Sequence, residues 1–219
     1  MRFKNREHAA TLLAARLSSY KGQSPLVLGV PRGAVPMARI IASALDGELN
    51  VVLVRKLRAP YQAELAIGAI DEAGAVLTGR HLDRAEVSEE YLREEIRTQS
   101  EVLRRRRRLY TGTRPQSTAT ARVVIIVDDG IATGSSMLAA IRSVRAQRPR
   151  KIVVAIAVAA PESLGVIQKE ADEVVCLHSP EDFYAVGQFF ENFSEVTDDM
   201  VVAALAGAVK AVTHAHAET

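Results

Sequence analysis

Residues 123–137 constrain the fold more than any other segment, because they join an aliphatic run to two adjacent carboxylates and a glycine-containing loop. The segment reads VVIIVDDGIATGSSM. Its first five residues predict a buried strand of a parallel sheet, and helical spacing of apolar residues follows directly. A loop at the carboxyl end of such a strand opens the crevice in which open α/β sheets bind ligands. The segment therefore predicts an α/β fold with a binding site at this loop.

The loop has the composition of a phosphate site. Gly130 and Gly134 allow backbone N–H groups to approach an anion, and the N-terminus of the following helix adds a favourable dipole. Thr133, Ser135 and Ser136 add hydroxyl donors. A turn with capping hydroxyl residues explains any three of these residues, but not the complete string.

Asp128 and Asp129 need a separate explanation, because paired carboxylates would repel a phosphate. Such a pair can accept hydrogen bonds from vicinal hydroxyl groups of a sugar, or it can act around a divalent metal ion. Either alternative places the two acids beside the phosphate.

The rest of the chain alternates between strand and helix patterns, which predicts a doubly wound, mostly parallel sheet. We expect a lead-in helix over 5–20, and helices over 34–45 and 139–145. The expected core strands cover 25–30, 49–54, 123–127, 151–159 and 173–177. Residues 55–115 interrupt this rhythm with a hairpin over 67–77 and a long charged helix over 88–109.

Composition limits the classes of protein that fit. A chain of 219 residues, 48% of them hydrophobic, can bury the core of one domain. The net charge of +2 does not by itself imply a polyanionic partner, and the single cysteine, Cys176, excludes an internal disulfide. No metal-ligand constellation is evident among the five histidines. Without an apolar leader or a membrane-length apolar run, we expect a cytoplasmic protein with no membrane partner.

Two further segments place cations at strand ends. Residues 29–36 read GVPRGAVP, so Arg32 and Gly33 lie between a strand and a helix, where an arginine can donate to phosphate oxygens. An ordinary strand-to-helix turn with a solvated arginine is the alternative. Arg55 and Lys56 follow the next expected strand and can meet the same anion.

The 123–137 string resembles the phosphoribosyl pyrophosphate (PRPP) signature of type I phosphoribosyltransferases. In that family the two acids hold the ribose hydroxyls, which implies this role for Asp128 and Asp129. The loop that cradles the 5′-phosphate corresponds to Ile131, Ala132, Thr133, Gly134 and Ser135, after Gly130. The 29–36 segment resembles the pyrophosphate loop, which often carries a non-proline cis peptide, expected here between Pro31 and Arg32. The Arg55–Lys56 pair resembles that of adenine phosphoribosyltransferases.

The resemblance also implies a domain plan. The whole chain, 1–219, would form one domain with a core over about 25–178, an insert over about 70–120, a hood over about 179–199 and a C-terminal helix over 200–212. Phe183 and Tyr184 in the hood would stack on a nucleobase. A mobile active-site loop would cover 61–68, where Glu64 is either a proton-handling group or a solvated glutamate.

The expected activity is transfer of the 5-phosphoribosyl group from PRPP to a nucleobase nitrogen, with Mg²⁺ held mainly by PRPP and a homodimer as the assembly. The resemblance to purine enzymes slightly favours a purine acceptor. One departure concerns Ala132, which stands where enzymes of the hypoxanthine-guanine type carry an aspartate that takes the base proton.

The alternative is a non-catalytic PRPP-sensing regulator that binds RNA or DNA. The run of arginines at 104–108 is its only sequence support. Consecutive helical positions point all round the axis, so these arginines are better explained as cations at the end of a helix, with nucleic acid not expected as a partner.

Overall fold

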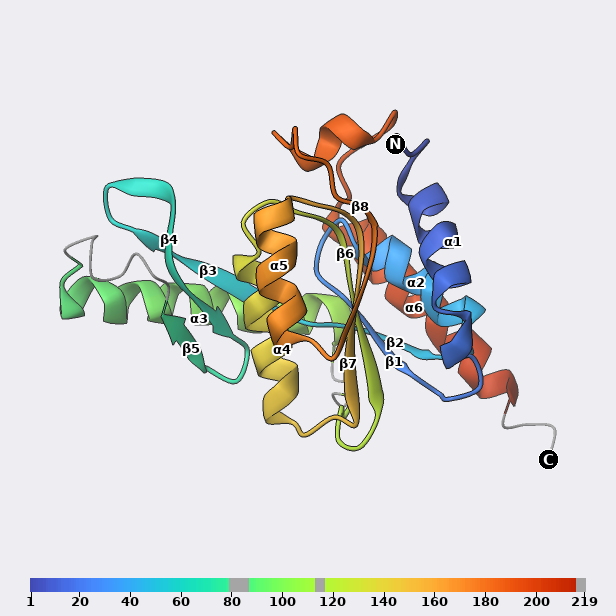
Figure 1. Cartoon of the computed structure of the whole chain (residues 1–219). Helices are drawn as coiled ribbons and strands as arrows, with labels where there is room; N and C mark the ends of the chain where they lie inside the picture. Colours follow the sequence, from blue (N-terminus) through green and yellow to red (C-terminus); the bar gives the residue numbers. More distant parts are fainter. Residues whose placement is uncertain (79–86, 113–116, 216–219) are drawn as a thin grey trace.

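A computed structural model describes residues 1–78, 87–112 and 117–215, and within these ranges it describes no side chains for 62–66, 77–78 and 208–215. Five parallel strands form the central sheet in the order β2-β1-β6-β7-β8 (Figure 1). They are β1 (Leu26–Gly29), β2 (Glu48–Val51), β6 (Val123–Ile131), β7 (Lys151–Ala159) and β8 (Glu173–His178). The parallel α/β sheet predicted from the sequence is therefore confirmed.

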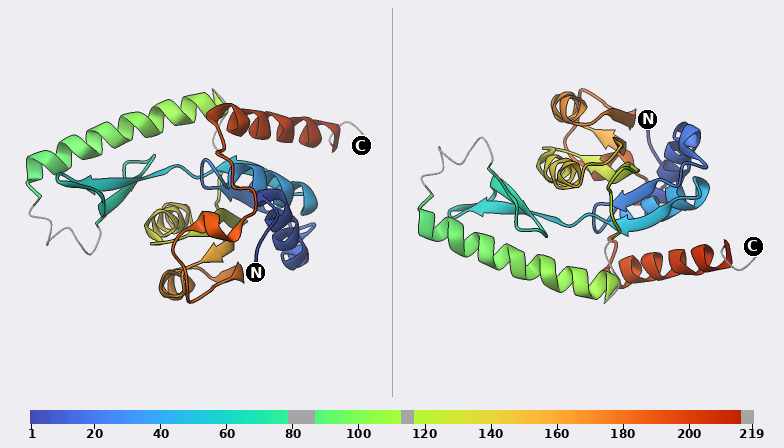
Figure 2. Two further views of the ribbon diagram at one scale, coloured as in Figure 1. Left: turned by 90° about the horizontal axis from the view of Figure 1, so that it is seen from above. Right: turned by 90° about the horizontal axis from the view of Figure 1, so that it is seen from below.

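Helices cover both faces of this sheet (Figure 2). The side chains of Val123, Ile125 and Val127 pack in one apolar cluster with α1 (Arg6–Arg16) and α2 (Val35–Ala44). Those of Val124 and Ile126 pack in a second cluster with α4 (Ser135–Ala146) and α5 (Pro161–Glu170). Because both faces are buried, β6 carries a continuous aliphatic run instead of alternating apolar and polar residues.

Residues 54–78 form a second, antiparallel sheet in the order β3-β4-β5. Its strands are β3 (Val54–Ala59), β4 (Gln62–Asp71) and β5 (Val76–Thr78). The expected turn around residues 72–74 is confirmed, and Gly74 supplies the positive φ of 85° that it needs. Two expectations are wrong: the strand over 49–54 ends at Val51, and residues 61–68 lie mostly in β4 instead of a loop. The backbone pairing of β3 with β4 satisfies polar groups that a loop would leave to water.

The long helix α3 (Glu89–Thr111) confirms the helix expected over 88–109, and the Ser88 side chain caps it by accepting a hydrogen bond from the Tyr91 N–H. Figures 1 and 2 show that α3 and the β3-β4-β5 sheet extend together beyond the central sheet. We call this unit, residues 54–78 and 87–111, the arm. Leu103 on α3 and Leu57 and Ile67 on the small sheet are buried in one cluster, which holds the arm together.

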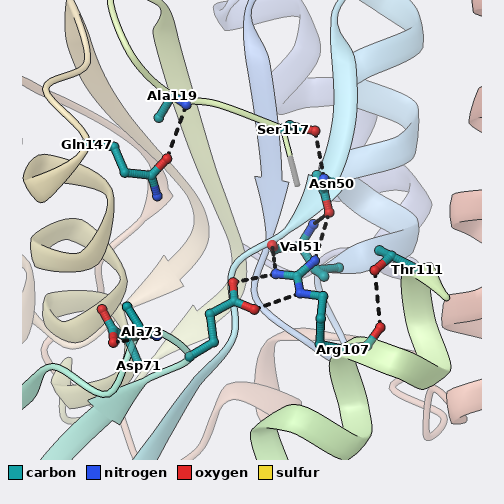
Figure 3. Close-up of polar contacts among 10 residues, drawn as sticks. Asn50, Val51, Asp71, Ala73, Arg107, Thr111, Ser117, Ala119 and Gln147 are labelled. Carbon is teal, nitrogen blue, oxygen red and sulfur yellow. Dashed lines mark hydrogen bonds and ion pairs between the residues drawn. The ribbon is translucent and has the colours of Figure 1, made fainter. Parts of the chain in front are cut away.

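Arg107 joins the arm to the core (Figure 3). Its Nη2 donates to the Val51 carbonyl over 3.2 Å and its Nη1 donates to Asn50 Oδ1 over 3.2 Å. Its Nε donates to Glu72 Oε2 over 2.6 Å, in an ion pair with side chains only 16% and 22% exposed. One of the five clustered arginines therefore has a tertiary partner that helix-end electrostatics did not predict.

The C-terminal part returns to the central sheet. The hood region, residues 179–199, contains one short 3₁₀ helix, η2 (Val186–Phe189). The last helix, α6 (Asp198–Ala215), begins two residues before its expected start, and its Val201, Ala204 and Leu205 are buried in the cluster shared with Val35. Among the described residues, no helix combines the length and the apolar character needed to span a lipid bilayer.

Candidate functional site

The two acids lie in the part of β6 that extends beyond the neighbouring strand β1. The last residue pair between β1 and β6 is Gly29 with Val127, whereas pairing with β7 continues to Ile131. Asp128 and Asp129 are therefore strand residues at the carboxyl edge of the sheet, next to the point where β1 departs into its loop. The strand is four residues longer than the sequence predicted.

The loop after β6 turns sharply into α4. Gly134 is the N-cap with φ 76° and is buried, and Ser135 begins the helix. The Ser163 hydroxyl donates a 2.6 Å hydrogen bond to the Ala132 carbonyl, which fixes the loop against α5. Ala132 and Thr133 are exposed, so the loop faces solvent with the first N–H groups of α4 free of intrahelical partners, as an anion site requires.

The loop after β1 contacts the acid pair. The expected cis peptide between Pro31 and Arg32 is confirmed. A Cβ atom added to Gly33 would lie 2.1 Å from Asp129 Oδ2, so the residue at this position cannot carry a side chain without displacing the carboxylate. The structure thus brings the loop after β1, with Arg32 and Gly33, to the acid pair that the sequence predicted separately.

The two acids have different surroundings. Burial, followed by the neighbouring charge of Asp129, raises the pKa of Asp128 well above its ordinary value. The Asp129 N–H donates to Asp128 Oδ1 over 2.9 Å, which partly offsets this rise. The carboxylate of Asp129 instead forms a 2.7 Å ion pair with Arg6.

Sequence reasoning missed two partners of the site. Arg6 belongs to the first turn of α1, 123 residues before Asp129, and nothing in the helical pattern of 5–20 marks it. Glu195 forms a short ion pair with Arg32 and is itself 73% exposed. The guanidinium expected to bind phosphate is thus held by a carboxylate of the hood region.

The strand-end cations lie at the start of β3. Arg55 is half-buried, and its Nε donates to Gln99 Oε1 of α3 over 2.9 Å. Burial, followed by the charges of Arg106 and Arg58, lowers the pKa of Arg55. Lys56 is exposed. Arg55 therefore contacts the arm helix, a partner that its strand-end position did not predict.

The comparisons with known proteins agree with this geometry. The model of the phosphoribosyl transferase domain matches residues 3–194. The chain belongs to the phosphoribosyltransferase family. Its parallel central sheet has the type I arrangement expected from the sequence, and the family is one of glycosyltransferases that act on pentosyl groups.

Relatives of this phosphoribosyltransferase chain include both longer and similar-sized proteins. A Mycobacterium tuberculosis H37Rv protein, provisionally named a phosphoribosyl transferase, is 42% identical over 209 residues, which cover 93% of this chain and 46% of the relative. Its counterpart in strain CDC 1551 has the same identity and coverage, so the chain spans about half the length of these curated relatives. The crystal structure of TT1426 from Thermus thermophilus is 44% identical with a TM-score of 0.82, over 94% of this chain and 99% of that one.

Three further residues were expected in the site of this phosphoribosyltransferase: Phe183, Tyr184 and Glu64. Phe183 is half-buried, with its ring 5.6 Å from that of Phe189, whereas Tyr184 is 88% exposed. Glu64 lies in β4, and its side chain is outside the part of the chain that the structure describes. Tyr184 therefore has a free ring face, while Phe183 is mainly part of the apolar packing.

Proposed function

We propose that this domain transfers the 5-phosphoribosyl group from PRPP to a ring nitrogen of a nucleobase and releases pyrophosphate. The observation that carries the proposal is the contact between the loop after β1 and the acid pair at the end of β6, in which Gly33 leaves room for Asp129. PRPP has two anionic ends joined by a ribose, and a pair of carboxylates between two anion loops is complementary to that molecule.

Different residues of the site bind different parts of PRPP. Asp128 and Asp129 accept hydrogen bonds from the ribose 2′- and 3′-hydroxyls, and the loop 131–135 binds the 5′-phosphate. Arg32, Gly33, Arg55 and Lys56 bind the pyrophosphate. The two acids hold the ribose in place, and the pyrophosphate-binding residues stabilise the charge of the leaving group. Because these hydrogen-bond donors are in position before pyrophosphate leaves the anomeric carbon, the barrier to its departure is lowered.

Magnesium would bind to this site together with PRPP. No group of three or more His, Cys, Asp or Glu side chains among the described residues could hold a metal ion. The ion would take most of its ligands from PRPP, and Asp128 and Asp129 could supply protein oxygens. When bound, it would neutralise charge on the departing pyrophosphate.

A purine acceptor is slightly favoured, on the resemblance of the hood sequence to that of purine enzymes. Tyr184, whose ring is exposed, can stack on a flat base, and Phe183, which packs on Phe189, is the second aromatic candidate. Ala132 has no proton-accepting group, so a base proton must pass to another residue, for which Glu64 is our candidate, or the acceptor reacts already ionised. A homodimer is the proposed assembly.

A second candidate function, PRPP sensing coupled to RNA or DNA binding, is favoured by one observation. Arg104, Arg105 and Arg108 are exposed on α3, and none has a carboxylate partner within the described part of the chain. Exposed arginines without such partners attract polyanions.

Pyrophosphate release distinguishes the two functions. We would incubate the protein with PRPP and Mg²⁺ and screen adenine, hypoxanthine, guanine, xanthine, uracil and orotate, with the double variant Asp128→Asn/Asp129→Asn as control. Release that depends on one base and disappears in the control is expected. PRPP binding without release for any base, together with salt-dependent RNA or DNA binding that PRPP alters, would instead support the regulator.

A further inference from the structure

Arg6, the first residue of α1, lies between three parts of the site that are far apart in the sequence. Its Nε donates to Asp129 Oδ2 over 2.7 Å, and its Nη1 donates to the Ser194 carbonyl over 2.7 Å. Its guanidinium carbon lies 3.8 Å from the centroid of the Phe193 ring. A Cβ added to Gly33 would lie 3.2 Å from Arg6 Nη2. One guanidinium therefore joins the acid pair, the loop after β1 and the hood region.

The position of this guanidinium is held by the backbone before it. The Phe3 N–H donates to the Phe189 carbonyl over 2.8 Å, and the Glu191 N–H donates to the Phe3 carbonyl over 2.9 Å. The Asn5 side chain then caps α1 by accepting a hydrogen bond from the His8 N–H. The start of α1 is thus attached to the hood region, which fixes the backbone from which the Arg6 side chain reaches the site.

The pair between Arg6 and Asp129 is well shielded from water. The two side chains are only 13% and 14% exposed, so salt screens their attraction weakly and the charge-assisted hydrogen bond is strong. Oδ2 of Asp129 is occupied by this bond. The Asp128 side chain also forms a hydrogen bond with the Asp129 side chain, and no other described residue donates to Oδ1 of Asp129. The pair thereby fixes one oxygen of the acid and leaves the other open to a ligand.

We propose that Arg6 is a positioning residue of the PRPP site, which orients Asp129 so that Oδ1 accepts a hydrogen bond from a ribose hydroxyl. The inference rests on the proposed function, since it assigns Asp129 to the ribose. It makes the N-terminal helix part of the substrate site, where the sequence predicted only a lead-in helix.

Calorimetric titration with three ligands tests this role. PRPP, ribose 5-phosphate and inorganic pyrophosphate, each with Mg²⁺, are titrated into the wild type and the variant Arg6→Gln. We expect binding of PRPP and ribose 5-phosphate to weaken about tenfold or more, and binding of pyrophosphate, which has no ribose, to change less than about twofold. Arg2 is exposed on the same N-terminal segment, so the matched control Arg2→Gln should bind all three ligands as the wild type does.

A double variant tells whether Arg6 acts by positioning Asp129 or by supporting the fold in general. Because Arg6 acts through Asp129, adding Arg6→Gln to Asp129→Asn should weaken PRPP binding by no more than about twofold. Equal weakening for all three ligands, or the same tenfold loss in the Asp129→Asn background, would overturn the proposal. Arg6→Lys, which keeps the charge over Phe193, serves as a second variant if Arg6→Gln does not fold, and should show the same ligand pattern with a smaller loss.

The wild-type titrations separate this inference from the proposed function. Failure of the wild type to bind PRPP would contradict the proposed function itself. Wild-type binding of PRPP that is unaltered in Arg6→Gln would contradict the role of Arg6 alone.

Discussion

At the scale of single residues, the candidate site depends on close approaches that leave no space for a side chain. Gly33 meets the carboxylate of Asp129, and a Cβ added to Gly130 would lie 2.3 Å from Val186 Cγ1 of the hood region. Gly33 has no positive φ, so space and not backbone conformation requires glycine there. A methyl group at this position must push Asp129 away from Arg6.

We therefore expect Gly33→Ala to weaken PRPP binding at least tenfold, because the displaced carboxylate loses its fixed geometry. Gly165→Ala in α5 is the matched control, since a Cβ there meets nothing within 4 Å. Alanine in a helix should raise the free energy of unfolding of that control by up to about 1 kcal/mol and leave PRPP affinity unchanged. Calorimetric titration and thermal unfolding measure both effects. Wild-type affinity in Gly33→Ala would show that the loop can move without cost.

At the scale of elements, α3 is attached to α6 through Tyr110. This side chain is 3% exposed, and its hydroxyl donates to Asp198 Oδ1 over 2.5 Å. Burial, followed by this hydrogen bond, raises the pKa of Tyr110 to about 12 from its ordinary value of 10.0. The protonated hydroxyl is therefore the form that stabilises the packing of the two helices.

The raised pKa predicts an alkaline loss of stability. Because the folded-state pKa lies above the unfolded-state value, the contribution of Tyr110 is complete below pH 10 and is lost as the pH rises from 10 through about 12. Tyr110→Phe should lower the free energy of unfolding by about 1 kcal/mol at pH 8 and show a smaller additional loss between pH 10 and 12. Urea unfolding across this pH range measures both. Tyr61→Phe, at a side chain 96% exposed, is the control, and an alkaline loss equal in Tyr110→Phe and wild type would contradict the assignment.

At the scale of the whole molecule, the site joins segments that are distant in the chain. The N-terminal helix, the loop after β1, β6 and the hood region each contribute a residue to the contacts around Asp129 and Arg32. A ligand that contacts these segments together binds the folded chain and not the unfolded one. Its binding must therefore stabilise the whole fold.

PRPP with Mg²⁺ should accordingly raise the melting temperature. At a ligand concentration about 100 times Kd, binding adds about 2.7 kcal/mol, which corresponds to roughly 5–10 °C for a chain of this size. Differential scanning fluorimetry measures the shift, and chelation of the metal with EDTA should remove most of it. Asp128→Asn/Asp129→Asn should show no shift. A rise in that variant equal to the wild type would place the ligand elsewhere.

What the sequence determined by itself is the part of the fold that depends on local pattern. The aliphatic run of 123–127 predicted a strand buried on both faces, and the glycines and hydroxyl residues near its end predicted the turn into the following helix. The same holds for the turn at Gly74 and the capped helix after Ser88, because turn and cap chemistry act between near neighbours.

Only the tertiary structure decided which distant side chains meet. Arg6 and Asp129 are separated by 123 residues, and Arg32 and Glu195 by 163, so no spacing or periodicity links them. The strand expected over 49–54 ends at Val51, and residues 54–59 instead form β3 of the arm. This difference was likewise set by the pairing of β3 with β4 and its packing on α3. Such contacts follow from the packing of whole elements, and the free energy of packing depends on surfaces that exist only once the chain is folded.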